Sequence, residues 1–384
     1  MKKTIFLTIL LILVPLLSYG QESNNQLIEE EADLFINEDL NSFIDDLVST
    51  NEIAPDIDIK HFLTSIVSGK ESIDINTIFS KLGNIFFQEI NDNLKLLSQI
   101  LIVAIISAIL NNMQTVFEGS SISGLANYVT YILLAILIIG SFYQIVEITR
   151  DTITSMVNFM QVILPVLLTL LVLAGGPNTK LIFHPMIVAT VNVIGSLVKN
   201  VIFPLVHFSF IISILSNLSQ RMELKKLSEL GRQIIVFIIS ASFTVFIGII
   251  TIYGLSTKID GITIRTAKFA VDKFVPIVGG FLSDAVETVI GSSMILKNGI
   301  GIIGLIALIL ITAIPIIKIS TLLLIYKITG AVVEPIVSKN VSNLLNDVSK
   351  SFLLILISTV SVAIMFFITI TIIVDTGNNL LMIR

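Results

Sequence analysis

Five ionisable side chains interrupt otherwise apolar stretches of this sequence: Lys199, His207, Lys318, Lys327 and Glu334. An ionisable group at membrane depth is costly to bury, so each is a candidate contact with a transport pathway or a partner. Snorkelling of the charged end to the membrane surface is the alternative for Lys199, Lys327 and Glu334. His207 alone is typical of a hydrogen-bonded packing histidine, and Lys318 can simply end a span. No two of these residues are spaced as a proton relay.

The sequence carries no motif of a common catalytic site. It lacks a Gly-Lys-Thr phosphate loop, a Gly-x-Ser-x-Gly elbow and a His-Glu-x-x-His pair. It has no cysteine, which excludes thiolate metal sites and cysteine nucleophiles. A metal would have to rely on His184 and His207. Four aspartates end apolar stretches, in no aspartyl-protease motif: Asp151, Asp272, Asp284 and Asp375. We therefore expect no enzyme, no cofactor and no metal site.

Helix-breaking residues are the second feature inside the apolar stretches. A proline removes a backbone donor, and such breaks are tolerated where backbone is buried in protein or lines a wet cavity. Several breaks together predict broken helices or re-entrant turns around a permease-like interior, whereas any one alone can be an ordinary kink. The positions are Pro165, Gly175, Gly176, Pro185, Pro204, Pro276, Gly279, Gly280 and Pro315.

The composition predicts the fold class that must hold these residues. Of 384 residues, 54% are hydrophobic and 13% are charged, and the mean hydropathy is +0.96. The apolar residues occur in runs, which points to lipid as their surroundings. We predict an all-α, multi-pass transmembrane helical protein. Its formal charge of -5 gives no reason to expect a nucleic-acid partner.

The N-terminus has the pattern of an export signal. Lys2 and Lys3 precede the apolar run Ile5–Leu17, and small residues flank a cut after Gly20. An uncleaved anchor is the alternative, but a run of this length reaches only about 20 Å, short of a hydrocarbon core of about 30 Å. We predict a cleaved signal peptide over residues 1–20.

An acidic segment follows over residues 21–94. It holds sixteen of the 28 acidic residues and three lysines. Leu40, Phe43, Ile44 and Leu47 have the spacing of one apolar helix face. We predict a short helical extracytoplasmic segment whose helices lie on the membrane surface or on a partner.

The polytopic membrane domain is predicted over residues 95–384, with seven to nine spans. The block 182–217 is too long for one straight span, so we divide it in two near Lys199-Asn200 and Pro204. The stretches 270–296 and 319–334 could be re-entrant or interfacial. The strong apolar stretches are 95–111, 128–146, 158–174, 233–254, 299–317 and 351–374.

A basic connector gives the best orientation marker. Arg221, Lys225, Lys226 and Arg232 should face the cytoplasm, since positively charged connectors tend to stay there. Counting spans from an exported N-terminus agrees with this side. Basic residues over 258–273 then lie outside, contrary to the same rule. The distal topology therefore stays open.

An internal duplication could relate residues 155–255 to 268–374. Val193-Ile194-Gly195-Ser196 is echoed by Val289-Ile290-Gly291-Ser292, and a Leu-Pro-Val motif by Phe-Val-Pro-Ile. Two related halves would face each other as in many transport folds. Chance agreement between apolar strings is an equal alternative.

Four motifs in order resemble the stage III sporulation protein AE family. They are Phe159–Gly176, the Ile182-Phe183-His184-Pro185 run, Ser219–Gln233 and Lys268–Lys297, within a resemblance over about residues 95–376. The resemblance implies a component of the channel apparatus between mother cell and forespore, needed for late forespore development. It implies a place in the outer forespore membrane. It also implies partners from the same stage III sporulation A operon, including a secretion-type ATPase and ring-forming proteins, and the forespore stage II protein Q.

The family offers no agreed substrate and no catalytic residues to carry over, although a permease-like role is compatible with it. The alternative function is a stand-alone secondary transporter of a small solute. A purely structural scaffold is a third hypothesis.

Overall fold

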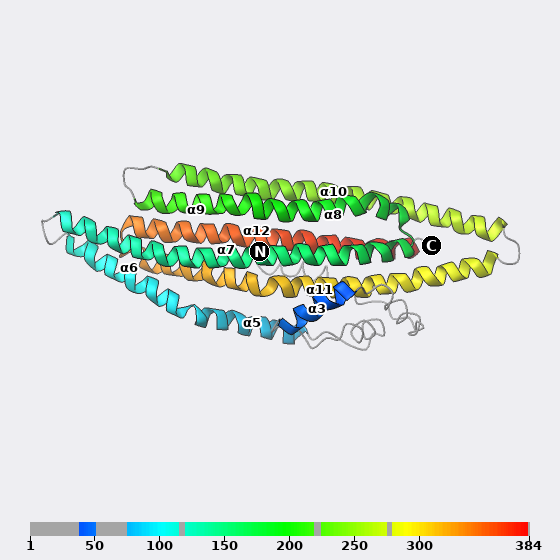
Figure 1. Cartoon of the computed structure of the whole chain (residues 1–384), viewed down its shortest axis with the longest axis horizontal. Helices are drawn as coiled ribbons and strands as arrows, with labels where there is room; N and C mark the ends of the chain where they lie inside the picture. Colours follow the sequence, from blue (N-terminus) through cyan, green and yellow to red (C-terminus); the bar gives the residue numbers. More distant parts are fainter. Residues whose placement is uncertain (1–37, 51–74, 115–119, 219–223, 275–278, 383–384) are drawn as a thin grey trace.

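The computed structural model describes residues 38–50, 75–114, 120–218, 224–274 and 279–382, and these are almost entirely helical (Figure 1). This confirms the all-α prediction for that part of the chain. The predicted signal peptide lies outside the described residues. The elements are α3 (Glu38–Thr50), α5 (Ile75–Asp92), α6 (Leu94–Gln114), α7 (Ser120–Leu173), α8 (Pro177–Leu197), the π-helical turn η2 (Val198–Ile202), α9 (Phe203–Leu218), α10 (Lys225–Phe274), α11 (Gly279–Val333) and α12 (Lys339–Met382).

The helices form one elongated bundle with its members roughly parallel to the long axis (Figure 1). Helix α12 packs against α11, α7, α9 and α10, and α11 also packs against α7. The chain passes from α9 to α10 and from α11 to α12 at one end, which we call the connector end. It passes from α7 to α8 and from α10 to α11 at the other, which we call the far end.

Six helical segments are long and apolar enough to cross a membrane: Ser80–Leu110, Tyr128–Leu173, His184–Leu218, Lys225–Tyr253, Thr288–Val333 and Lys339–Thr376. The described chain thus supplies six candidate spans where the sequence predicted seven to nine. The stretches 128–146 and 158–174, predicted as separate spans, belong to the single helix α7, and 299–317 and 319–334 both lie in α11. No turn separates the members of either pair. On α7 the polar residues between the two stretches, such as Glu147, Arg150 and Asp151, are exposed on one face of a helix whose other face is buried.

The division of residues 182–217 into two spans was also wrong. Helices α8 and α9 continue in one direction through η2. Pro204 has no backbone N–H, so the regular helical bond at that position is missing. The chain inserts a π turn there, and the Phe203 N–H bonds the Val198 carbonyl five residues back. Pro165, Pro185 and Pro315 likewise sit inside uninterrupted helices and do not end them.

Gly175 and Gly176 form a true reversal between α7 and α8. Gly175 has φ 95°, its N–H bonds the Val172 carbonyl at 2.9 Å, and the Gly176 N–H bonds the Leu171 carbonyl at 2.8 Å. These two bonds define a Schellman C-cap, and Pro177 then starts α8. Pro276 lies outside the described residues. Gly279 and Gly280 open α11 and so mark a helix start.

The N-terminal helix α3 has the predicted apolar face but a different partner. Leu40 and Ile44 are buried, and the Phe43 ring lies 5.4 Å from that of Phe159 on α7. Helix α3 therefore packs on α7 and α11 of its own bundle, not on the membrane surface or a separate partner. A polar helix with one apolar stripe is stabilised by any apolar surface that covers the stripe. The sequence of α3 therefore could not distinguish the membrane surface, a partner and its own bundle as that surface.

Close helix approaches and ring stacking hold the bundle together. A Cβ at Gly195 of α8 would lie 2.5 Å from the Val157 side chain of α7, so only glycine permits this approach. The Phe142 ring stacks on Phe210 with centroids 3.7 Å apart, and Phe352 lies 6.2 Å away. These aromatic contacts join α7, α9 and α12.

Candidate functional site

A polar groove lies between α7 and the α8–η2 rod. Its volume is about 440 Å³. Two cations and five amide or hydroxyl side chains line it, together with Val157 and Gly195. The polar lining residues are Arg150, Asn158, Gln161, Asn192, Ser196, Lys199 and Asn200.

Helical spacing places these side chains on facing stripes. Asn192, Ser196 and Asn200 follow one another at four-residue intervals, so they share one face of α8 and η2. The Gln161 amide donates to Asn192 Oδ1 at 2.7 Å across the groove, and the Asn200 amide donates to Ser196 Oγ at 2.9 Å. The Gly195–Val157 approach brings the two helices close enough for this pairing. The groove therefore has a fixed hydrogen-bonded wall.

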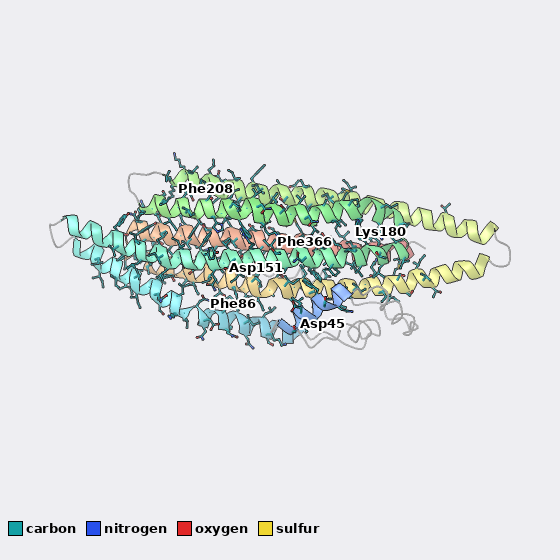
Figure 2. The ribbon with its side chains drawn as sticks, viewed as in Figure 1. Asp45, Phe86, Asp151, Lys180, Phe208 and Phe366 are labelled. Carbon is teal, nitrogen blue, oxygen red and sulfur yellow. The ribbon has the colours of Figure 1, made fainter. Side chains whose placement is uncertain are left out.

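The two cations retain unused donors. Lys199 Nζ donates to Thr154 Oγ1 at 3.3 Å, which occupies one of its three N–H groups. Within the described residues, the Arg150 guanidinium makes no hydrogen bond or ion pair. Glu147 and Asp151 are exposed on the same helix but do not line the groove, and Figure 2 shows Asp151 near mid-length of α7. The lining as a whole is thus positively charged.

The groove lies where the exposed faces of α7 and of the α8–α9 rod change from apolar to polar. On α7, the exposed apolar residues Ile136, Ile139 and Tyr143 give way to polar residues from Gln144 onward. On the neighbouring rod, exposed Phe208, Ile211 and Leu215 of α9 give way to the polar stripe of η2 and α8. Both stripes are apolar towards the connector end and polar towards the far end.

A second polar cluster lies near the connector end. Arg232 Nη1 of α10 and Asp347 Oδ1 of α12 form an ion pair at 3.0 Å, with side chains 12% and 8% exposed. The Asn217 amide donates to Asp347 Oδ2 at 3.0 Å, and Arg232 Nη2 donates to Ser213 Oγ at 2.7 Å. Ser228 Oγ lies 2.6 Å from Ser213 Oγ. This cluster ties α9, α10 and α12 together.

The predicted orientation residues therefore divide. Lys225 and Lys226 are exposed at the start of α10, as expected of a basic connector, and Arg221 lies outside the described residues. Arg232 is instead turned into the bundle, because Asp347 offers it a buried carboxylate.

The predicted pathway residues do not come together. Lys199 lines the groove. His207 Nδ1 lies 2.8 Å from the Phe203 carbonyl and its ring meets Phe142 edge-on at 5.2 Å, which is the contact set of a packing histidine. Lys318 is half-buried and Lys327 is exposed on α11. Pro165, Pro185 and Pro204 are exposed and none lines the groove.

Two further candidates, Asp347 and Lys297, are not among the site residues predicted from the sequence. Asp347 pairs with a residue 115 positions away, and nothing local marks it. Lys297 of α11 is fully buried, and its Nζ makes no hydrogen bond in the part of the chain that the structure describes. Asp375 of α12 acts on it electrostatically. A lysine within an apolar helix, beside Met294 and Ile300, could have been singled out.

No group of three or more His, Asp or Glu side chains that could hold a metal occurs among the described residues. The groove carries cations and amides, and such a donor set suits an anion better than a metal ion.

The sequence is similar to proteins of known family over nearly its whole length. The family model described as stage III sporulation protein AE matches residues 57–377. The stage III sporulation protein AE of Bacillus subtilis (strain 168) is 33% identical over 365 residues, which cover 94% of this chain and 91% of that protein. No solved structure matches. The chain therefore belongs to the stage III sporulation protein AE family, and with six apolar helices long enough to span a bilayer it is a sporulation-related membrane protein.

Proposed function

We propose that this protein is a non-enzymatic membrane component of a secretion-like channel complex between mother cell and forespore, needed for late forespore development. Family membership is the observation that carries the proposal. Its partners are other products of the stage III sporulation A operon, including a secretion-type ATPase and ring-forming components, and the forespore stage II protein Q. Its place is the mother-cell-derived outer forespore membrane.

The dimensions of the bundle support a role within an assembly. The apolar helical segment Tyr128–Leu173 has 46 residues, or about 69 Å at 1.5 Å per residue. A hydrocarbon core needs only about 30 Å. A large part of the same rod therefore stands outside the core, where other proteins can contact it.

The position of α3 supports an extracytoplasmic segment at the far end. Phe43 packs on Phe159, in the half of α7 that leads to Gly175. Lys225 and Lys226 lie at the opposite, connector end. An exported N-terminal segment followed by one crossing, α7 and the α8–α9 rod brings these lysines to the cytoplasmic side, in agreement with the positive-inside rule.

A stand-alone secondary transporter is the second candidate function. A permease-like role inside the complex is a related hypothesis, in which the protein passes a solute only together with its partners. The groove favours some contact with a polar solute. However, its lining residues Arg150, Asn158, Gln161, Asn192 and Asn200 are exposed, so it opens on the side of the bundle and not along its axis. The transporter hypothesis expects ionisable groups that converge on an interior site, and Lys199, Lys318 and Lys327 do not converge.

A clean gene deletion tests the proposal. We expect normal vegetative growth and engulfment, followed by loss of late forespore gene expression and of heat-resistant spores. Normal spore yield would refute it. Neutralising Lys318 and Lys327 together should leave spore yield unchanged, whereas a transporter that uses them would fail. Ion-coupled solute uptake by the purified protein alone in proteoliposomes would favour the transporter.

A further inference from the structure

The groove between α7 and the α8–η2 rod has the charge and donors of an anion site. Its two cations offer a planar guanidinium and an ammonium, and two amides add neutral donors. These are Asn158 and the one N–H of Asn192 Nδ2 that remains after its bond to the Val188 carbonyl at 2.9 Å. No acidic side chain is among the lining residues. The guanidinium of Arg150 has no partner among the described residues, and Lys199 Nζ uses one donor, on Thr154. Uncompensated cations within a membrane-spanning segment are costly, so an anionic ligand would stabilise them.

The surroundings of the groove select the kind of anion. It lies within two candidate spans, Tyr128–Leu173 and His184–Leu218. Its polar stripes run directly into exposed apolar stripes, represented by Tyr143 on α7 and Phe208 on α9. A ligand with a phosphate at one end and acyl chains at the other matches both parts at once. Basic pockets between transmembrane helices on the matrix or cytoplasmic side bind anionic lipid head groups in this manner, and this groove offers the same donors in the half of α7 that leads to the far end.

We propose that this groove binds the phosphate head group of an anionic phospholipid. Arg150 and Lys199 contact the phosphate oxygens, Arg150 through its paired N–H donors. Asn158 and Asn192 donate to the remaining head-group oxygens. The acyl chains lie along the apolar stripe towards the connector end. This binding is independent of the sporulation role proposed above, and either can fail without the other.

The test uses the full-length protein in a zwitterionic or neutral detergent with a fluorescent phosphatidylglycerol as probe. Binding is followed by fluorescence anisotropy. We expect Arg150→Gln and Lys199→Gln each to weaken binding by about tenfold, as loss of one charge-assisted contact implies. Lys318→Gln and Lys327→Gln are matched controls that should bind as the wild type does. Lys199→Arg should retain most of the affinity.

Competition separates the sources of the phosphate. Unlabelled phosphatidylglycerol should displace the probe, whereas inorganic phosphate at the same concentration should not. Equal displacement by inorganic phosphate would show a free-anion site and overturn the lipid assignment. Unchanged probe binding in both Arg150→Gln and Lys199→Gln would also overturn it. An unchanged unfolding temperature and helical circular dichroism show that a variant is folded.

Discussion

Replacing Asp347 by alanine is expected to destabilise the bundle by about 3–5 kcal/mol, the cost of breaking a buried ion pair from one side. The carboxylate accepts from Arg232 Nη1 and Asn217 Nδ2, both at 3.0 Å. Arg232, whose side chain is 12% exposed in the native structure, would lose its counter-charge. Lys350 Nζ lies 3.8 Å from the carboxylate but its side chain is 46% exposed, so its share is below about 1 kcal/mol.

Equilibrium unfolding in mixed micelles measures this difference, and a double-mutant cycle isolates the pair. Arg232→Met together with Asp347→Leu should recover most of the lost stability, since an apolar pair of similar size often replaces a buried ion pair at little cost. Lys226→Gln at an exposed position should change stability by less than about 0.5 kcal/mol. A loss under about 1 kcal/mol for Asp347→Ala, or a double variant no more stable than Asp347→Ala, would contradict this account of the ion pair.

Three further predictions rest on other parts of the bundle. Gly195→Ala should destabilise the fold by about 1–3 kcal/mol, because its Cβ would meet the facing valine of α7 at 2.5 Å. Gly140→Ala has open space around its Cβ and should stabilise the fold by up to about 1 kcal/mol. Thermal unfolding of the two variants measures the difference. Lys297→Met should raise the unfolding temperature, since it removes a fully buried amine that has no hydrogen bond among the described residues. A lowered temperature would mean that Asp375 compensates the charge of the amine. The chain has no native cysteine, so single cysteines can be placed at Leu181 and Lys226. They should react with a membrane-impermeant label from opposite sides of the membrane, because α8 and α9 form one rod. Reaction from the same side would restore the two-span division of this region.

The sequence was enough to predict the helical class and the apolar face of α3. These depend on local composition or on spacing within one helix. The reversal at Gly175-Gly176 was also predictable as a break, since only glycine readily takes the positive φ that ends α7.

The continuity of α7 and of the α8–α9 rod could not be predicted from the local sequence. The polar residues near Arg150 break the apolar pattern as a loop would, yet they are exposed on one face of an unbroken α7 whose other face is buried. Pro204 also has the local pattern of a chain reversal, yet the π turn Val198–Ile202 carries the helix past it. The partnership of Arg232 with Asp347 spans 115 positions and leaves no mark on either neighbourhood.

The length of the rods has a mechanical consequence. Helices α7, α11 and α12 run 54, 55 and 44 residues with no loop inside them, so an axial push or a rotation at one end reaches the other with little loss. The α8–α9 rod differs, because the π turn Val198–Ile202 departs from regular α-helical bonding. Bending of this rod would concentrate in this turn, which carries the groove residue Lys199. Strain applied at either end of the bundle would therefore change the width of the groove.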